Sequence, residues 1–520
     1  GLHGGAGAPA AAPAPLRLAQ GASRALAFRL DAPGTYYYWG TTTGRALDFR
    51  IREDAQLTGA IVVDPADAPA GPPRDRVFVL GMWTDTVGRA PVPRDHLLAV
   101  VNGRSWPHTE RLAYAVGDSA RWRLINASAD LHPMHLHGFY FRVDARGDGT
   151  VDTTYRDGVP RMAVTEAMSI GVTTAITWVP ERAGNWVFHC HIPEHFAPRA
   201  PLGMPPPTAH HGSGQHMGGL VLGVAVRDTA GARVVAVRRD APVPRELRLV
   251  VRENRGSADA APLFGFAAHA RGTAEPAPDS GRRAGAPLVL VRGEPVRIMV
   301  VNRLREPTAV HWHGIELESW YDGVPGVSGS GTRVAPMIAP GDSFEVRFTP
   351  PRAGTFLYHA HADEERQQGA GLAGPLLVLA PGARWDPAAD VPVLVGSPGT
   401  FADETRFLLI NGHAAPAPLV LEAGRPYRLR LMNMAVRRSG LLIGVVRGDA
   451  PLRWRRLAKD GADLPPALQG PTAARERVSI GETLDVEFTP ATRGDTLAID
   501  VRMPPRAGAR VFARWPILVR

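Results

Sequence analysis

The only cysteine of the 520-residue chain, Cys190, lies between two histidines, His189 and His191, and a third histidine, His195, follows five residues after it. A thiolate together with imidazoles is a soft set of ligands that suits copper. On an extended strand, the two flanking histidines point to the face opposite to the thiol. This segment could therefore serve two metal centres. The plainer alternative is a buried free cysteine beside solvent-facing histidines.

Three further His-X-His pairs occur in the chain. They are His135-Leu136-His137, which follows His132, then His311-Trp312-His313 and His359-Ala360-His361. Residues i and i+2 of a strand share a face, so each pair can present two imidazoles to one site. Eight histidines in four matched pairs predict a metal cluster between two domains, each of which contributes half of the ligands.

Short strands are predicted to position these residues. The chain has 56 glycines and 49 prolines, with Val, Thr and aromatic residues in short runs between them, which favours strands over long helices. A glycine, an alternating run and a second glycine thirteen residues later recur at Gly21/Gly34, Gly171/Gly184, Gly341/Gly354 and Gly481/Gly494. A glycine followed nine residues later by asparagine precedes three of them, at Gly117/Asn126, Gly293/Asn302 and Gly424/Asn433. These repeats predict an all-β chain of sandwich domains.

Proline-rich segments separate the repeats and predict four domains. Their ranges are 1–65 (domain 1), 75–240 (domain 2), 245–382 (domain 3) and 390–520 (domain 4). The glycine–asparagine pattern has no counterpart before Gly21, so we expect domain 1 to be only part of a sandwich and the sequence to be truncated at its N-terminus. Because Ala360 takes the repeat position of Cys190 and Thr308 that of His132, domain 3 keeps the paired histidines without the thiolate. Domains 1 and 4 lack the histidines and should be copper-free.

Taken together, these motifs resemble those of the multicopper oxidases, the laccase-like cupredoxin proteins. The family pattern of HWHG, HxH, HPxHLHG and HCHxxxH is matched by residues 311–314, 359–361, 132–138 and 189–195. The resemblance implies tandem cupredoxin-like Greek-key β-sandwiches, the first apparently truncated. It also implies four coppers per chain, one of type 1, one of type 2 and two of type 3.

The same resemblance implies which residue binds which copper. Cys190, His132 and His195 would bind the type 1 copper, and His135 and His311 the type 2 copper. The type 3 pair would be held by His137, His189, His191, His313, His359 and His361. Electrons would enter at Cys190 and cross one residue to His189 and His191.

The axial ligand of the type 1 copper and the acidic residue of the cluster are less defined. The family usually has Met or Leu ten residues after the cysteine, but Ala200 stands there, and a Pro- and His-rich insertion, 201–216, follows. Met217 is the preferred axial residue, and Leu220 and Met204 are alternatives. Asp322 stands where the family carries a carboxylate that could assist proton delivery, although an Asp-Gly turn would explain it equally well.

The order of the domains also departs from the familiar one. In three-domain members the HWHG domain comes first and the HCH domain last, whereas here the HCH domain precedes the HWHG domain. A fusion of two two-domain units would produce this order. We therefore expect the trinuclear site at the junction of domains 2 and 3 within one chain, with assembly between chains left open.

The implied function couples one-electron oxidation of a reducing substrate at the type 1 copper to four-electron reduction of O2 to water. The substrate would be phenolic, as in laccases, or a metal ion such as Cu(I) or Fe(II), and the lack of a long Met-rich insert favours the laccase-like class. The alternatives are a copper nitrite reductase, against which the eight paired histidines argue, and a non-catalytic copper-binding or electron-transfer protein.

Charge and hydropathy bear on partners and location. The net charge is +9, but the arginines are scattered and Lys459 is the only lysine, which argues against nucleic acid as a partner. No apolar run reaches the length of a membrane span. No signal peptide is visible, and the resemblance implies a periplasmic or secreted protein. Oligomeric state stays open.

Overall fold

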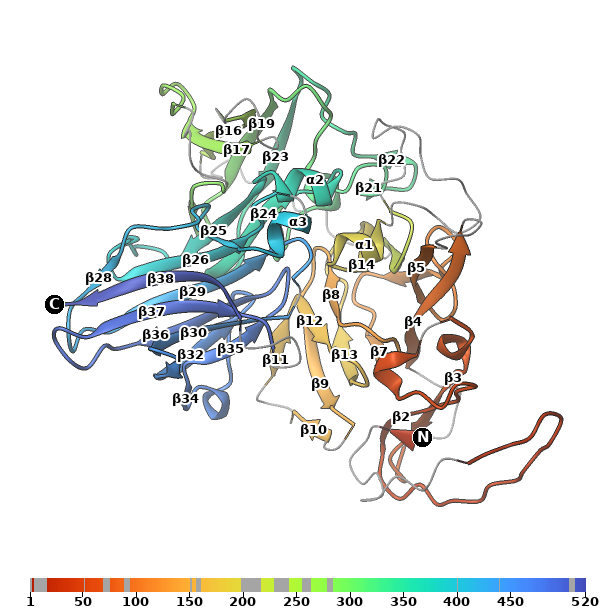
Figure 1. The fold of residues 1–520 in the computed structure, drawn as a ribbon. Coiled ribbons are helices and arrows are strands. Elements are labelled where there is room, and N and C mark those ends of the chain that lie inside the picture. Colours follow the sequence, from red (N-terminus) through yellow and green to blue (C-terminus); the bar gives the residue numbers. More distant parts are fainter. Residues whose placement is uncertain are drawn as a thin grey trace.

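The chain forms three β-sandwiches and a small N-terminal sheet in the computed structural model (Figure 1). The structure describes residues 2–3, 16–50, 52–68, 75–87, 94–149, 152–155, 160–197, 217–228, 243–254, 263–277, 284–399, 401–438, 440–504 and 510–520. Strands hold 48% of the residues and helices 5%. The all-β prediction is confirmed.

The sandwich of domain 2 pairs two sheets and carries the cysteine. One sheet has the order β10 (Asp152–Thr154), β9 (Phe141–Gly147), β13 (Thr173–Trp178), β7 (Ala120–Asn126), β4 (Arg76–Val87) and β5 (Arg94–Val101), with β11 (Arg161–Ala163) on β9. The other has β12 (Thr165–Met168), β8 (His132–Leu136), β14 (Gly184–Cys190), β15 (Val221–Arg227) and β6 (Arg111–Ala115). Helix α1 (Pro193–Phe196) follows β14.

Domain 3 repeats this plan with shorter sheets. One has the order β17 (Phe264–Ala270), β16 (Arg245–Glu253), β19 (Val296–Asn302) and β23 (Ser343–Phe348), and the other β18 (Leu288–Val291), β25 (Ala373–Leu379), β24 (Gly354–Ala360) and β20 (Val310–His311). The 3₁₀ helix η3 (Ser319–Tyr321) follows β20, and helix α2 (Glu364–Gly369) follows β24. The hairpin of β21 (Gly329–Ser330) and β22 (Arg333–Val334) joins domain 2, where Gly329 pairs with Asn185 of β14.

Domain 4 forms the third sandwich. One sheet has the order β27 (Leu409–Ile410), β26 (Asp390–Gly396), β29 (Tyr427–Met434), β36 (Thr483–Phe488), β32 (Arg453–Lys459) and β33 (Ala462–Asp463), with β34 (Pro471–Ala473) on β32. The other has β28 (Leu419–Leu421), β38 (Val511–Val519), β37 (Thr496–Arg502), β30 (Leu441–Arg447) and β31 (Ala450–Pro451), with β35 (Arg475–Val478) on β30. Helices α3 (Phe401–Glu404) and η4 (Pro466–Leu468) are short.

The burial pattern separates strands with one face toward the core from strands that are enclosed on both faces. Strand β19 alternates buried and half-buried residues along its length, as a strand with one face toward the core should. By contrast, every residue of β8 and β24 is buried. These strands pack one face on the core of their own domain and the other against a neighbouring domain, so the histidines lie at domain interfaces.

The glycine–asparagine repeat and the glycine–glycine repeat meet in the same hydrogen-bonded arrangement in all three sandwiches. Asn126, Asn302 and Asn433 are fully buried, and each donates from Nδ2 to two backbone carbonyls and accepts at Oδ1 from the N–H two residues on. Its own carbonyl accepts the N–H of the repeat glycine, Gly171, Gly341 or Gly481. These glycines have φ angles of 78°, 80° and 79°, in the left-handed region that favours glycine.

Domain 1 departs from the expectation. Its described strands are β1 (Leu2–His3), β2 (Gly34–Trp39) and β3 (Thr58–Val63), with 3₁₀ helices η1 (Leu47–Phe49) and η2 (Arg52–Gln56). The strand predicted after Gly21 is wrong, because residues 22–30 form no strand and leave Leu26 and Phe28 61% and 58% exposed. Among the described residues no strand lies beside this segment to pair with it, and alternation alone does not supply a hydrogen-bonding partner. None of the helices in the described part of the chain is long and apolar enough to cross a bilayer.

Candidate metal centre

Three residues predicted for a type 1 site meet at one end of domain 2. His132 begins β8, Cys190 ends β14, and His195 lies on α1. Their potential ligand atoms all lie within 4.8 Å of one another, and the Cys190 Sγ is 3.5 Å from the His195 Nδ1. The Ser128 hydroxyl contacts the His132 Nε2 at 2.8 Å and leaves the buried Nδ1 without a hydrogen bond. One sulfur and two imidazole nitrogens thus face a common point.

The electrostatics of this site follow from burial and from the thiol. Burial, helped by the neighbouring His195, lowers the pKa of His132 to about 3. Burial alone would lower the pKa of His195 as well, but Cys190 and Asp130 outweigh it and raise that pKa to about 10. The His195 Nε2 lies 3.5 Å from the Asp130 Oδ2, and the Asp130 side chain is 53% exposed. His195 therefore connects the buried site to the surface.

Eight histidines form a second group between domains 2 and 3, which we call the histidine cluster. Their nitrogen atoms make three sets within 4.8 Å, namely His137, His189 and His361, then His191, His313 and His359, and finally His135, His137 and His311. All eight side chains are at most 2% exposed. The rings of His135 and His313 stack at 3.8 Å between centroids. Every set draws on both domains, so the cluster exists only where they meet.

Backbone and carboxylate oxygens orient most of these rings. The Nδ1 atoms of His135, His189, His311 and His359 lie 2.7–2.9 Å from the carbonyls of Val164, Cys190, Asp322 and Ala360, and the His137 Nδ1 lies 2.9 Å from the Asp322 Oδ2. A proton held on Nδ1 leaves Nε2 as the free ligand atom, which is how outer contacts fix the tautomer of metal-bound histidine. The donor atoms are preset toward the centre of the cluster.

Crowding and burial keep the imidazoles neutral. Burial first, and neighbouring histidines second, lower the pKa of His189 to about 3 and hold those of His135, His137, His191, His313 and His359 well below the usual value. Neutral imidazole is the metal-binding form. His361 differs, since Glu364 and Asp322 outweigh burial and raise its pKa. The buried Glu364 carboxylate lies 3.0 Å from the His361 Nδ1.

Asp322 lies beside the histidine cluster, in the interior of the protein and not on its surface. Its side chain is fully buried, its Oδ2 accepts a hydrogen bond from the Ser328 hydroxyl at 3.2 Å, and its backbone carbonyl faces His311. The Oδ1 atom makes no hydrogen bond with the described residues. The Asp-Gly turn is present, with Gly323 at a φ of 89°, and it presents this carboxylate to two histidines.

The structure separates the candidates for the axial position. Met217 packs with Val187, Phe196 and Val221, and Val187 points to the face of β14 opposite to Cys190 because side chains alternate along a strand. Leu220 is fully buried in the same core cluster as Cys190. Its N–H donates to the His195 carbonyl at 2.7 Å and its carbonyl accepts the Cys190 N–H at 3.1 Å. Leu220 thus contacts both Cys190 and His195 through its backbone, and the identity of the axial ligand stays a prediction. Met204 and the insertion 201–216 lie outside the described residues.

Several residues near the site escaped the sequence argument. Glu364 stands three residues after His361, a helical spacing that could have drawn attention to it. Asp130 stands two residues before His132 and offered no motif. For Glu194, whose place beside His195 follows from the sequence, only the partner was not foreseen: it pairs with Arg437 of domain 4, a contact between distant segments that no local pattern encodes. The contacts of domain 4 with the cluster were likewise not foreseen.

The donor set fits copper. A thiolate with two imidazoles suits a copper electron-transfer site, and clustered imidazoles suit copper among the metals that bind nitrogen. Buried nitrogens without a hydrogen bond among the described residues include the Nδ1 atoms of His132 and His191 and the Nε2 atoms of His359 and His361. Unpaired buried nitrogens are costly unless a ligand satisfies them. The sandwich fold and these two sites are those expected of a copper protein of the cupredoxin class.

Comparison with known proteins narrows the class. Family models described as multicopper oxidase match residues 73–199 and 280–383, which are the halves of domains 2 and 3 that carry the histidines. Over these two segments the chain matches the multicopper oxidase family.

Named relatives match over short segments. The copper resistance protein A homolog of Pseudomonas syringae pv. tomato is 41% identical over 97 residues, 18% of this chain and 15% of that protein. Dihydrogeodin oxidase of Aspergillus terreus is 36% identical over 132 residues, 24% of this chain and 20% of that protein. The chain thus spans about a fifth or less of these relatives. A multi-copper oxidase structure from Pseudomonas thermotolerans superposes with a TM-score of 0.40 and 24% identity over 54% of this chain and 64% of that one.

Proposed function

We propose that the chain is a laccase-like oxidase that removes single electrons from a reducing substrate beside His195 and reduces O2 to water at the histidine cluster. One observation carries the proposal. The two covalent neighbours of Cys190 belong to different sets of the cluster, His189 to the set with His137 and His361, and His191 to the set with His313 and His359. The thiol therefore lies one residue from each half of the cluster.

The family resemblance supplies the ligand assignment, and the grouping of the side chains supports it. His132, Cys190 and His195 would hold a type 1 copper with Leu220 at the axial position, and His135 and His311 a type 2 copper. The two remaining sets would hold the type 3 pair, which makes four coppers per chain. Bound copper would supply the one-electron redox steps, while the protein fixes ligand geometry and excludes water from a site whose histidines are buried.

The protein's own acidic groups would handle protons. Asp322 has one carboxylate oxygen without a hydrogen bond within the described part of the chain, and it contacts histidines of both domains. A proton held at the Asp322 Oδ1 would be within reach of the cluster, where O2 reduction consumes protons. Glu364 beside His361 offers a second such position.

The substrate would meet the protein at His195 and Asp130. The Asp130 carboxylate is half exposed beside the outer nitrogen of His195, so it could accept a hydrogen bond from a phenolic hydroxyl. We favour phenols over metal ions, because among the described residues Asp130 is the one carboxylate paired with His195, and the neighbouring Glu194 is engaged by Arg437. One available carboxylate is a poor site for a cation that prefers several ligands. A periplasmic or secreted location is part of the proposal.

Copper content and oxygen uptake test this function. The expected result is four coppers per chain with oxygen consumption on a phenol exceeding that on Cu(I). The variant Cys190→Ser should lose the thiolate absorbance and the oxygen uptake. A copper content well below four, or uptake that survives this substitution on the same substrates, would overturn the proposal in favour of a copper nitrite reductase or a non-catalytic copper protein.

A further inference from the structure

Domain 4 contains no ligand of either site, yet it packs directly on the histidine cluster. In Figure 1 its sheets lie against the strands of domains 2 and 3. A Cβ added to Gly481 would lie 2.6 Å from the ring of His191, and one added to Gly461 would lie 2.6 Å from the ring of Phe356. Domain 4 therefore packs directly on domains 2 and 3 at these two glycines, with no side chain between the backbone of domain 4 and the two rings.

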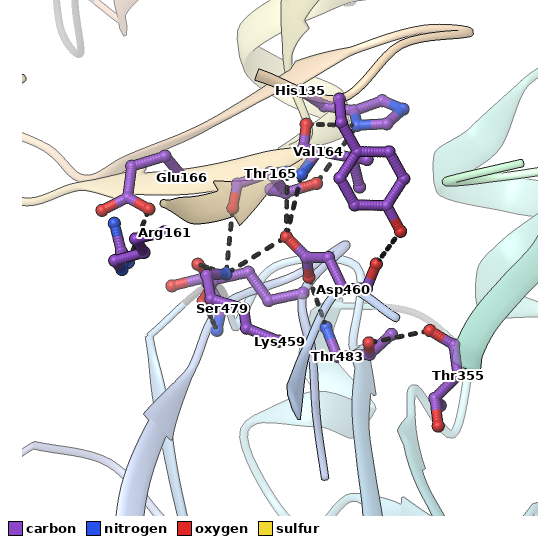
Figure 2. Close-up of polar contacts among 12 residues, drawn as sticks. His135, Arg161, Val164, Thr165, Glu166, Thr355, Lys459, Asp460, Ser479 and Thr483 are labelled. Carbon is purple, nitrogen blue, oxygen red and sulfur yellow. Dashed lines mark hydrogen bonds and ion pairs between the residues drawn. The ribbon is translucent and has the colours of Figure 1, made fainter. Parts of the chain in front are cut away.

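The polar part of this interface converges on Asp460. This residue and Gly461 form the two-residue turn between β32 and β33, both at positive φ, as a tight hairpin turn requires. The Asp460 Oδ2 accepts the N–H groups of Val164 and Thr165, each at 3.1 Å, and the Oδ1 accepts the N–H of Thr483 at 3.0 Å (Figure 2). The side chain is 1% exposed.

Lys459, the only lysine of the chain, adds a second set of hydrogen bonds to this interface. Its ammonium donates to the Thr165 carbonyl at 2.9 Å (Figure 2). It also donates to the Glu482 carboxylate at 2.8 Å. Burial alone would lower the pKa of Lys459, but Asp460 and Glu482 outweigh it and the pKa is raised. Burying such an ion pair is seldom the cheapest way to stabilise an interface, since apolar residues do so equally well. The pair is better explained by the geometry that it imposes.

The peptide held by domain 4 is the one that orients two ligands. The Val164 carbonyl lies 2.9 Å from the His135 Nδ1. The Thr165 hydroxyl lies 3.1 Å from the same atom and 3.2 Å from the His313 Nε2. Thr165 is also the partner of His135 in the pairing of β12 with β8. A shift of this peptide would turn one ring of domain 2 and one ring of domain 3 together.

We propose that Asp460 and Lys459 are positioning residues for the cluster ligands His135 and His313. The proposal rests on the proposed function and gives the ligand-free domain a structural role. Domain 4 clamps the 164–165 peptide from the outside, so that both imidazoles are held in ligand geometry before copper binds. The clamp acts through hydrogen bonds to backbone groups, and it requires no contact between domain 4 and the metal.

The test compares Asp460→Asn with Asp500→Asn. Asparagine tolerates the positive φ at residue 460 but places an N–H group where Asp460 accepts hydrogen bonds. Asp500, with Arg502, forms a buried ion pair inside domain 4, so its variant reports the general cost of a lost carboxylate. Readouts are copper titration of the metal-free protein, copper per chain after dialysis against a chelator, the electron paramagnetic resonance signal of type 2 copper, the thiolate absorbance and the unfolding midpoint.

The expected result is selective. Asp460→Asn should weaken type 2 copper binding by about tenfold, as changes beside a metal ligand commonly do, and should alter the type 2 signal while the thiolate absorbance stays. Asp500→Asn should lower the unfolding midpoint and leave copper binding unchanged. If Asp460→Asn does not fold, Lys459→Gln is judged by the same criteria.

Three outcomes overturn the proposal, and they differ in what else they overturn. If the unaltered protein binds copper at the cluster and Asp460→Asn binds it equally well with the same type 2 signal, the clamp is wrong and the oxidase function stands. If the unaltered protein takes up no copper at the cluster, both proposals fail. An equal loss of copper in Asp460→Asn and Asp500→Asn would also overturn the clamp, since it would reflect stability alone.

Discussion

At the scale of single residues, Cys190 and Ala360 occupy equivalent places and differ by one sulfur atom. Both are fully buried, and each offers its carbonyl to the Nδ1 of the preceding histidine, at 2.8 Å for Cys190 and 2.9 Å for Ala360. The ring orientation of the flanking histidines thus does not depend on the thiol. The segment around Ala360 in domain 3 therefore shows how the segment around Cys190 would be arranged without the thiol.

We therefore expect Cys190→Ala to remove one copper and spare the others. The substitution makes a small cavity that should cost about 1–2 kcal/mol, which a protein of this size tolerates. Copper analysis should show a loss of one ion per chain, with the type 2 resonance signal retained. Loss of the cluster copper as well would contradict the separation of the two sites.

Leu220→Met tests the axial position. A thioether sulfur at this place would bind the type 1 copper weakly and lower its reduction potential, which leucine leaves high because it offers no axial bond. A redox titration should show the decrease. Met217→Leu is the matched control, and it should leave the potential unchanged because Met217 packs behind β14. A potential that responds to the control and not to Leu220→Met would restore Met217.

Asp130→Asn tests the substrate contact. Asparagine keeps the shape but accepts a weaker hydrogen bond from a phenolic hydroxyl, so kcat/KM for phenols should fall about tenfold, equivalent to about 1.4 kcal/mol. A donor without a hydroxyl group, such as a metal complex that transfers electrons without bonding, serves as control and should react at the original rate. Equal losses on both donors would place the role of Asp130 in the type 1 site itself.

At the scale of elements, the four strands β8, β14, β20 and β24 carry or adjoin imidazoles that should make the metal-free protein sensitive to acid. Seven histidines have lowered pKa values, whereas His195 and His361 have raised ones. A lowered histidine pKa gives stability that is complete above the unfolded pKa of about 6.5 and is lost as pH falls. A raised histidine pKa has the opposite effect on stability. Its stabilising contribution is complete below the unfolded pKa and is therefore kept as pH falls.

The seven histidines with lowered pKa values outnumber the two with raised values. The free energy of unfolding of the metal-free protein should therefore decrease from pH 7 to pH 5. The slope should reach about 1.4 kcal/mol per pH unit for each histidine that takes up a proton only on unfolding. Urea unfolding at a series of pH values measures it. A free energy that stays constant over this range would mean that the histidines are not buried in the metal-free protein.

Local patterns sufficed to predict the elements that hold the site. Alternation, the glycine–asparagine repeat and the four histidine pairs each depend on residues close in sequence, and the structure contains all of them. The strand expected after Gly21 is absent because a strand also needs a hydrogen-bonding partner. The sequence could not decide between Met217 and Leu220 as the axial residue, because the side of a sheet on which a loop returns is not encoded locally. The contact of Asp460 with Thr165 joins distant segments, so no periodicity could reveal it.

At the scale of the whole molecule, the proposed copper ligands belong to two domains, and the third sandwich packs against the 164–165 peptide beside them. Copper that binds only the folded state should stabilise it, by about 4 kcal/mol at a concentration a thousand times the dissociation constant. Because the cluster draws ligands from both domains, this stabilisation should be shared between them. Domain 4 should gain less, since it holds no ligand.

Hydrogen exchange measured by mass spectrometry can separate these contributions. Stripping the copper should increase exchange in peptides from β8, β14 and β24, with little change in β37, which lies in the core of domain 4. The β37 peptides are the internal control. A uniform rise over all three sandwiches would show that the molecule opens as one unit, and no rise at all would argue against copper at the cluster.

The contact between Gly481 and His191 also limits which substitutions position 481 can accept during evolution. Gly341 and Gly481 fill the same place in their repeats with nearly the same φ, and asparagine is the usual substitute for glycine in that conformation. Nothing lies within 4 Å of a Cβ at position 341, whereas the imidazole of His191 blocks one at position 481. Gly341 is therefore free to become asparagine over evolutionary time. Gly481 can do so only in descendants that have lost the histidine at position 191.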